Sequence, residues 1–385
     1  MDEVPIGLAI ERRALVVGGT GPTGPFVVQG LRERGFAVTM LHSGRHERAE
    51  IAADVRHVHV DPFDRRAVDD ALSGRTFDLA VIMYGRLREL VELLAGRVGR
   101  LVTVGGAPVI PGFGDPDAVW PAGMEVPTLE GEIGTVGSGG RPVNHKVARM
   151  VETEAAVFAA RPDATHLRYP LIYGPHQLLP REWMVVRRVL DGRRRLILPD
   201  GGLYLCSAAY VANAATAVLL CADSTEVAGR IIHVSDEATP TLRQVVEVVA
   251  SALDHSFELV DMPYQLATPA HPLMLRSGSF HRYTPPTALL RLGYRDAVPW
   301  RQALATTARW LADHRPPAGG SIERNLQDPF DYDAEDELLR AWDAARAAVA
   351  EAAARADPHL VDRYAPTYEA DRARRRQLRS GRGAP

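Results

Sequence analysis

Hydrophobic and polar positions follow two different periods along the first part of the chain. Short apolar runs rich in β-branched residues predict strands at residues 14–17, 37–41, 55–60, 77–83 and 100–104. The segments between them carry apolar residues at helical spacing and predict helices at residues 25–35, 65–72 and 87–95. Strands and helices that alternate in this order predict an α/β fold with a doubly wound parallel sheet, whose ligands lie at the carboxyl ends of the strands.

The first predicted strand ends in a glycine-rich turn, GGTGPTG at residues 18–24. Gly18, Gly21 and Gly24 lack a Cβ where the backbone turns tightly, where a pyrophosphate approaches the main chain, and where helix and strand pack closely. Free N–H groups at the start of the following helix would face the phosphates. A turn without a ligand is the alternative, but the strands on either side favour a dinucleotide site that includes Thr23.

The residues after the second strand bear on the kind of dinucleotide. A site for NAD usually has a carboxylate near His42, whereas the 2′-phosphate of NADP needs small polar groups and a cation. Ser43 and Arg45 follow this strand, and the sequence places no acid at the strand end itself. The pattern favours NADP over NAD, with Arg45 as an ordinary solvated charge as the alternative.

The third predicted strand, VRHVHV at residues 55–60, places His57 and His59 on one face. Two histidines at this spacing suggest a metal, but the sequence shows no third ligand nearby, so an exposed strand face is favoured and no metal is predicted. Asp61 follows the strand and is expected near the adenine end of the dinucleotide. Asp64 is expected to cap the next helix.

Composition sets further limits. The chain has 385 residues, of which 46% are hydrophobic and 24% are charged, enough for a large core and about two domains. No apolar run is long enough to cross a bilayer, and the first residues do not resemble a secretory signal, so a cytoplasmic location and no membrane partner are expected. Cys206 and Cys221 are expected to be reduced thiols, and the net charge of -3 argues against a nucleic-acid partner.

Several motifs together resemble one family. Besides the turn at residues 18–24, they are LRYPLIYGP at residues 167–175, the run 231–235 with TLRQ at 241–244, and LGY at 292–294 before a last helix. Over residues 12–315 the chain resembles an extended short-chain dehydrogenase/reductase of the NAD-dependent epimerase/dehydratase family. The resemblance implies a Rossmann-type NAD(P)-binding domain over residues 1–175 and a substrate-binding lobe over residues 176–315, interleaved with the core.

The chain departs from that family at the residues that move protons. Family members that reduce, oxidise or epimerise carry a Ser or Thr after the fifth strand and a Tyr four residues before a Lys, and the Tyr is the acid/base. Lys146 matches the Lys and would hold the nicotinamide ribose, but Gly106 stands at the Ser position and Pro142 at the Tyr position. If the family reaction takes place here, the proton needs another route.

Three residues are candidates for that route. Tyr84 follows the fourth strand and enters the cavity from the opposite wall, or else shapes the substrate site or the core. His145 has a reference pKa near ~6.5 but is rotated by roughly 100° from Lys146 on a helix. Thr103 lies inside a strand and is expected to bond to the backbone or to pack.

Two acids on the same helix are expected to take no part in the chemistry, because they sit too far along it. Glu152 is expected to pair with Arg149. Glu154 is expected to be exposed to solvent.

Two loop regions are expected to contact the substrate. Residues 111–140 form a long segment rich in Gly and Pro at the ligand-bearing edge and predict a lid, with a surface Ω-loop as the alternative. In the substrate lobe, arginines suit anions and tryptophan supplies a flat apolar wall. The predicted substrate contacts are His176, Arg181, Trp183 and Arg282.

The chain changes composition beyond Pro316. A linker at residues 317–321 precedes an Ala/Glu/Arg-rich segment, 334–356, which predicts an amphipathic helix. Such a helix needs a groove on its own subunit or on a second copy, so a homo-oligomer is one expectation. The Arg-rich end, residues 371–383, is expected to be a solvated tail.

Two functions from different classes fit the sequence. The first is an NADP-dependent oxidoreductase or epimerase/dehydratase that acts on a small hydroxylated or carbonyl-containing metabolite. The second is a cofactor-sensing module or a redox-silent isomerase/cyclase on the same fold. Lys146 and the glycine-rich turn favour the first, whereas the missing Ser and Tyr favour the second.

Overall fold

The computed structural model describes residues 12–83, 86–130, 145–274 and 278–355. The chain divides into two compact units, Met1–Pro329 and Phe330–Pro385. Among the described residues, no helix combines the length and the apolar character that crossing a bilayer requires.

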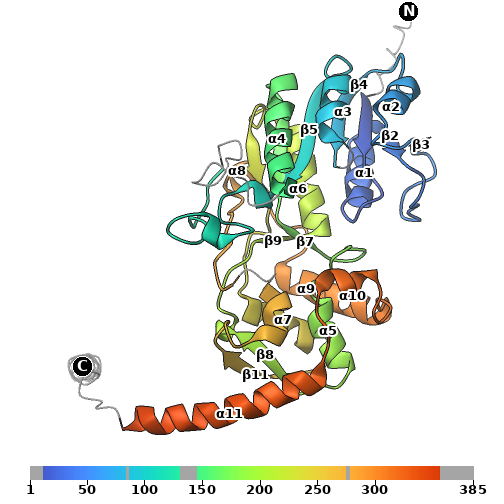
Figure 1. Ribbon diagram of the computed structural model, residues 1–385. Coiled ribbons are helices and arrows are strands. Elements are labelled where there is room, and N and C mark those ends of the chain that lie inside the picture. Colours follow the sequence, from blue (N-terminus) through green and yellow to red (C-terminus); the bar gives the residue numbers. More distant parts are fainter. Residues whose placement is uncertain (1–11, 84–85, 131–144, 275–277, 356–385) are drawn as a thin grey trace, which may run out of the picture. The chain divides into compact units, whose positions relative to one another are not determined.

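A seven-stranded sheet organises the first unit (Figure 1). Its spatial order is β10-β6-β5-β4-β1-β2-β3, and every neighbouring pair is parallel. The strands are β1 Arg12–Val17, β2 Phe36–His42, β3 Arg56–His59, β4 Phe77–Ile82, β5 Val98–Gly106, β6 Thr165–Tyr169 and β10 Ile231–His233. The strand order reverses between β1 and β4, so the doubly wound parallel sheet predicted from the sequence is confirmed.

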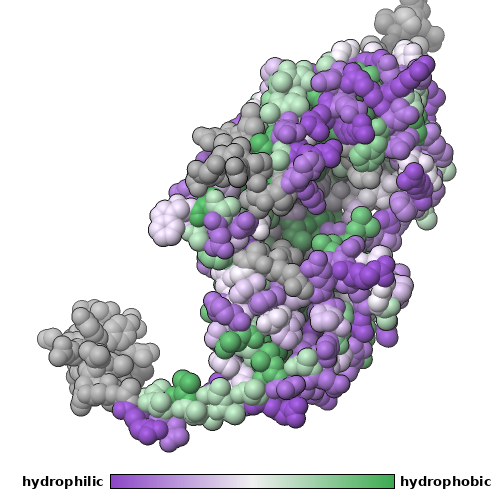
Figure 2. Space-filling model, viewed as in Figure 1, coloured by the Kyte–Doolittle hydropathy of each residue, from purple (hydrophilic) through white to green (hydrophobic). Residues whose placement is uncertain are grey.

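Helices cover both faces of this sheet because its strands are apolar on both sides. In β1, Ala14 and Val16 join one buried cluster, while Leu15 and Val17 join the other. The first cluster lies under α1 (Gly24–Glu33), α6 (Val211–Asp223) and α8 (Thr287–Arg291). The second lies under α2 (Arg65–Ala71), α3 (Leu87–Leu94) and α4 (His145–Ala160). In Figure 2, hydrophilic residues cover much of the visible surface over this part of the chain.

The chain after β6 builds a second group of elements within the same unit. Strand β8 (Arg195–Pro199) pairs in parallel with β11 (Glu258–Met262), and β7 (Leu171–Tyr173) pairs with β9 (Ala208–Tyr210). The helices of this group are α5 Trp183–Leu190, α7 Leu242–Ser251, α9 Trp300–Asp313 and α10 Ser321–Leu326. Short 3-10 turns in the described part of the unit are Ala107–Val109, Pro116–Ala118, Asp200–Gly202 and Thr268–Met274. The predicted domain boundary at residues 175/176 stays a prediction.

The second unit contains α11, Tyr332–Ala354, close to the predicted range of 334–356. The side chain of Asp331 accepts a hydrogen bond from the amide of Ala334 and so caps the helix start. Val349, on its apolar stripe, is 67% exposed. Its pairing with a second copy stays a prediction, and the Arg-rich end lies outside the described residues.

Candidate functional site

The glycine-rich turn between β1 and α1 has the backbone geometry that the sequence predicted. Gly18 has φ of 89°, in the left-handed region that favours glycine. A Cβ on Gly24 would lie 2.0 Å from the carbonyl oxygen of Gly19, so helix and turn approach more closely than a side chain permits. Gly21 differs, since its Cβ would meet nothing nearer than 3.5 Å. That position leaves room for a ligand above the main chain.

Helix α1 begins at this turn with its amide end uncapped. Within the described residues, no side chain caps the helix at Thr23, and its first turn holds no acid. Thr23 is buried, and its hydroxyl donates to the Sδ of Met83, 3.7 Å away, at the end of β4. An uncapped helix start carries partial positive charge and suits an anion. The turn and the helix start together fit the pyrophosphate of a dinucleotide.

The ends of β2 and β3 hold the residues predicted for the adenosine half. Ser43 and Arg45 are exposed, and the Nε of Arg48 donates to the carbonyl of Thr20 in the glycine-rich turn, at 2.9 Å. Asp61 is exposed and accepts from the amide of Phe63, at 3.0 Å. The contact of Arg48 with Thr20 joins the loop after β2 to the glycine-rich turn. The roles of Ser43, Arg45 and Asp61 in dinucleotide binding stay predictions.

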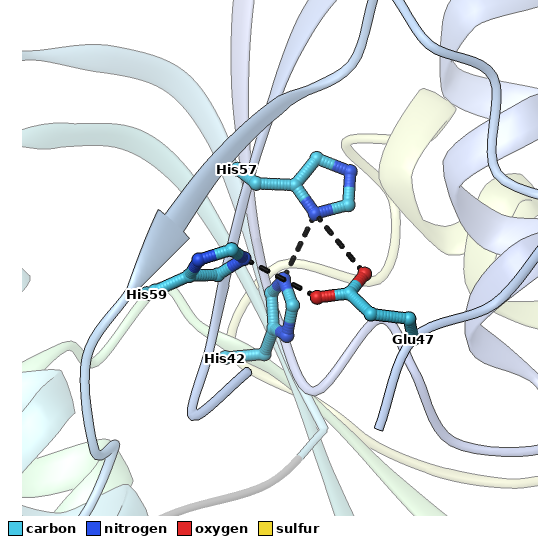
Figure 3. Close-up of side chains that lie close together, drawn as sticks. All are labelled: His42, Glu47, His57 and His59. Atoms are coloured by element: carbon cyan, nitrogen blue, oxygen red, sulfur yellow. Dashed lines mark hydrogen bonds and ion pairs between the residues drawn. The ribbon is translucent and has the colours of Figure 1, made fainter. Parts of the chain in front are cut away.

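Two expectations from the sequence were wrong at this edge: that no acid lies at the end of β2, and that His57 and His59 have no third ligand nearby. The loop after β2 brings the carboxylate of Glu47 beside His42, so an acid does lie at this strand end. His42 and Glu47 also stand next to His57 and His59, which therefore have further ligand-type neighbours (Figure 3). This cluster was not predicted from the sequence, because the pairing of β2 with β3 and the path of the loop after β2 bring its members together.

A cavity of about 730 Å³ opens at the carboxyl ends of β4 and β5. Met83 follows β4 and Val104–Gly106 end β5, while one face of α4 forms the opposite wall. The residues of α4 that line it are Lys146, Arg149, Met150, Thr153 and Glu154. Their spacing of three to four residues places them on one side of the helix. A parallel sheet binds ligands at this edge.

The structure separates the two adjacent candidates at the start of α4. Lys146 lines the cavity and is exposed. His145 is also exposed but is not among the lining residues, as its rotation on the helix predicts. Tyr84 and Pro142 lie outside the described residues. The catalytic roles of Tyr84, His145 and Lys146 stay predictions.

A buried polar network lies in the inner wall of the cavity, and it was not predicted from the sequence. The Nε and Nη2 of Arg168 donate to the two carboxylate oxygens of Glu154, both at 2.8 Å. The Nε2 of His166 lies 3.5 Å from Oε1 of Glu154, and its Nδ1 lies 2.8 Å from the hydroxyl of Thr103. The Thr103 hydroxyl also donates to the backbone carbonyl of Thr165 at 3.4 Å, as predicted, whereas its contact with the His166 side chain was not predicted. Facing positions on β5 and β6 meet α4 here, a juxtaposition invisible in the linear sequence.

Glu154 corrects a specific expectation, because it is 1% exposed rather than on the surface. Burial raises the pKa of its carboxyl, but the hydrogen bonds and charges of Arg168 and His166 outweigh burial and hold that pKa at about 2. Glu152, two residues earlier, pairs with Arg88 at 2.8 Å, so its predicted pairing with Arg149 was wrong. Glu154 therefore lines the cavity as a carboxylate that is already paired with the guanidinium of Arg168.

The glycines at the end of β5 pack closely against neighbouring side chains. A Cβ on Gly106 would lie 2.9 Å from the Cε of Met150 and 3.2 Å from the Cδ of Pro108. A Cβ on Gly105 would lie 2.4 Å from the Nε2 of His166. A side chain at either position would require these neighbours to shift, which the flexible end of Met150 permits more readily than the buried ring of His166.

Three predicted substrate residues lie away from this cavity. Arg181 is buried, donates to the hydroxyl of Tyr204 at 3.3 Å, and lines a separate cavity of about 190 Å³. The indole Nε1 of Trp183 donates to Glu323 at 2.9 Å. The Nε of Arg282, also buried, donates to the carbonyl of Phe113 at 2.6 Å. These contacts bind parts of the chain to one another, and contact with substrate stays a prediction.

His176 lines another cavity, of about 600 Å³, formed largely by residues of α1 and α6. Its Nε2 lies 3.2 Å from Oε1 of Glu50. Burial and the charge of Arg48 lower the pKa of His176, and Glu50 opposes that change. His176 is therefore not brought together with Lys146, and its role toward substrate stays a prediction.

The segment predicted as a lid is described up to residue 130. Phe113 and Met124 are buried in a cluster with Ala107, Val109 and Ile110. The amide of Thr128 donates to the carbonyl of Tyr283 at 3.1 Å. The first part of the segment is thus packed, while residues 131–140 lie outside the described residues and the lid stays a prediction.

Comparison with known proteins relates this geometry to solved structures. No family model and no curated protein sequence matches the chain. The Bordetella bronchiseptica enzyme WbmG in complex with NAD has a TM-score of 0.60 and 14% identity, covering 81% of this chain and 97% of that one. The dTDP-glucose 4,6-dehydratase of Bacillus anthracis in complex with NAD has a TM-score of 0.58 and 15% identity, and the match covers 79% of this chain and 97% of that one. The UDP-glucose 4-epimerase of Thermus thermophilus, also with NAD, has a TM-score of 0.57 and 20% identity, and the match covers 77% of this chain and 98% of that one.

These similarities establish the fold. The chain shares the architecture of NAD-dependent epimerases and dehydratases, as its sequence motifs predicted. At 20% identity or less, the similarity leaves substrate and chemistry to be argued from the residues of this chain.

Proposed function

We propose that the protein binds a nicotinamide dinucleotide and acts as an oxidoreductase or epimerase/dehydratase on a small hydroxylated or carbonyl-containing metabolite. The observation that carries the proposal is the position of Lys146, on a cavity of about 730 Å³ at the edge of the sheet that bears the glycine-rich turn. The glycine-rich turn and the uncapped start of α1 lie at the carboxyl end of β1, and the cavity lies at the carboxyl ends of β4 and β5. A fold of this kind binds its ligands at that edge of the sheet.

Different residues would bind different parts of the dinucleotide. The turn at Gly18–Gly24 would hold the pyrophosphate, and Lys146 would hold the nicotinamide ribose, as the family resemblance implies. The dinucleotide, when bound, supplies hydride transfer. Ser43 and Arg45 would hold a 2′-phosphate, so NADP remains our preference, whereas Glu47 beside His42 and the NAD in similar structures support NAD.

Replacing Lys146 with alanine should lower kcat/KM by about 100-fold or more, or weaken dinucleotide binding, because an unheld nicotinamide is misplaced for transfer. Lys146 is exposed, so the thermal midpoint should stay close to that of the parent protein. Steady-state kinetics and a cofactor titration measure the effect. Lys146→Arg, which keeps the charge, should retain part of the activity. Parental kinetics in Lys146→Ala would remove Lys146 from its assigned role.

The preference for NADP can be tested at Arg45. A charge-assisted contact contributes about 1.5–3 kcal/mol, so Arg45→Ala should weaken NADP binding about tenfold or more. Binding of NAD, which has no 2′-phosphate, should change little. Arg66→Ala removes an exposed arginine of α2 and serves as the control in the same fluorescence titrations. Equal affinities for the two dinucleotides, unaffected by Arg45→Ala, would contradict the preference.

The residues at two positions also favour a second function. Gly106 stands where family members have a serine and Pro142 stands where they have a tyrosine, so neither position supplies a hydroxyl. This favours a protein that keeps its dinucleotide for sensing or for redox-silent isomerisation. Absorbance of the reduced nicotinamide is followed during incubation with candidate carbonyl compounds. Net oxidation supports the reductase, and tight binding without turnover supports sensing. Product with unchanged cofactor is the result expected both of an epimerase or dehydratase that returns its hydride and of a redox-silent isomerase.

A further inference from the structure

The cluster at the ends of β2 and β3 gathers four groups of the kind that bind transition metals (Figure 3). His42 ends β2, and His57 and His59 come from β3, where His59 pairs directly with His42 in the parallel register. Glu47 reaches them from the loop after β2. One nitrogen from each histidine and one carboxylate oxygen all lie within 4.8 Å of one another.

The distances between these atoms approach those around a tetrahedral ion. The Nε2 of His42 lies 2.9 Å from the Nδ1 of His57, which lies 3.8 Å from Oε2 of Glu47. The Nε2 of His59 lies 3.4 Å from Oε1 of Glu47. Ligands about 2.0–2.1 Å from a tetrahedral Zn²⁺ are about 3.4 Å apart. The three distances, which involve both carboxylate oxygens of Glu47, differ from that value by about half an ångström or less, and every pair among the four ligand atoms lies within 4.8 Å.

The types of ligand also suit a cation. His42 is 4% exposed, so its ring is held away from bulk solvent. A neutral imidazole is the form that binds a metal. Three imidazoles and one carboxylate give the cluster a charge of about -1, which a divalent cation complements.

Metal binding at the Nε2 of His42 has two identifiable costs. The hydrogen bond of 2.9 Å between this nitrogen and the Nδ1 of His57 is lost. The Nδ1 of His42 accepts a hydrogen bond from the amide of Gly44, at 3.3 Å, and this nitrogen would carry the ring proton once Nε2 binds a metal. The bonds to the metal exceed both lost hydrogen bonds in strength.

We propose that His42, His57, His59 and Glu47 form a binding site for a transition-metal dication, with Zn²⁺ as the ion that best fits the ligands. Four protein ligands close the coordination sphere, which is typical of structural sites. The ion would fix the loop that contains Glu47 against β2 and β3. That loop also carries Ser43 and Arg45, but binding of the ion requires no dinucleotide and is measured without one.

The test uses the full chain without an affinity tag, stripped with a chelator and titrated calorimetrically with Zn²⁺. One Zn²⁺ per chain should bind and raise the thermal midpoint. His59 and Glu47 are exposed, so His59→Ala and Glu47→Gln should fold normally. Each should weaken Zn²⁺ binding by more than the roughly 10- to 100-fold that loss of an outer-shell partner costs. Co²⁺ should give the intense visible absorption of a tetrahedral site in the parent protein only.

His46→Ala is the matched control, because it removes an exposed histidine of the same loop that does not belong to the cluster. It should bind Zn²⁺ as the parent protein does. No saturable binding, or binding that His59→Ala and Glu47→Gln leave unchanged, would overturn the proposal. The same conclusion would follow if His46→Ala weakened binding as strongly as the ligand variants.

Discussion

Replacing Glu154 with glutamine should lower the free energy of unfolding by about 3–5 kcal/mol, the range for breaking a buried ion pair by removing one partner. The side chains of Glu154 and Arg168 are 1% and 5% exposed, so the guanidinium loses its counter-charge where water cannot replace it. Glutamine keeps the size and one acceptor oxygen, so the variant loses the charge and one of the two hydrogen bonds from Arg168. Urea unfolding at neutral pH measures the difference.

Glu152→Gln is a matched control on the same helix. The Glu152 and Arg88 side chains are 59% and 39% exposed, and surface ion pairs contribute about 0–1 kcal/mol. This variant should unfold almost as the parent protein does. A loss in Glu154→Gln no larger than that in Glu152→Gln would show that the buried pair contributes nothing specific.

The effect of Glu154 should also depend on pH. Its pKa falls from 4.5 to about 2 on folding, so the folded state favours the ionised form. The stabilisation is therefore fully present above pH 4.5 and is lost as the pH falls toward about 2. The gap between the parent protein and Glu154→Gln should shrink from pH 7 to pH 3. A gap that stays constant over this range would contradict the cause assigned to it.

Gly24→Ala should disrupt both the fold of the turn and dinucleotide binding. The new Cβ would lie 2.0 Å from the carbonyl oxygen and 2.3 Å from the carbonyl carbon of Gly19. Because both atoms belong to the backbone, a side-chain rotation cannot relieve the contact. Overpacking costs about 1–3 kcal/mol, and this rigid site should lie at the upper end. Thermal unfolding and a nicotinamide dinucleotide titration measure the two losses.

Gly21→Ala separates binding from folding in the same motif. Its Cβ would meet only the carbonyl oxygen of Gly18, at 3.5 Å, which is an ordinary contact. The thermal midpoint should therefore stay near the parental value, while the methyl group occupies the space that a pyrophosphate would use. Dinucleotide binding should fall with little loss of stability. Parental affinity in Gly21→Ala would remove the turn from the binding site.

The sequence alone determined the sheet and the turn that starts it, because both depend on local patterns. Short apolar runs and helices of period 3.6 predicted the order of the elements between residues 14 and 104, and the structure confirmed it with boundaries that differ by a residue or two. The glycines in the turn at residues 18–24 were interpretable because backbone turning and close packing each exclude a Cβ at a fixed spacing. Lys146 was found by its position relative to the family motifs.

The tertiary structure alone decided which distant polar groups meet. Glu154 was predicted to be exposed, but pairing of β5 with β6 puts Arg168 and His166 beneath it. His42 and His59 are far apart in the sequence, yet parallel strands place them side by side. Local period reports which face of an element is buried, whereas strand register and loop path, set by the packing of the whole sheet, determine which charged and metal-binding side chains share that face.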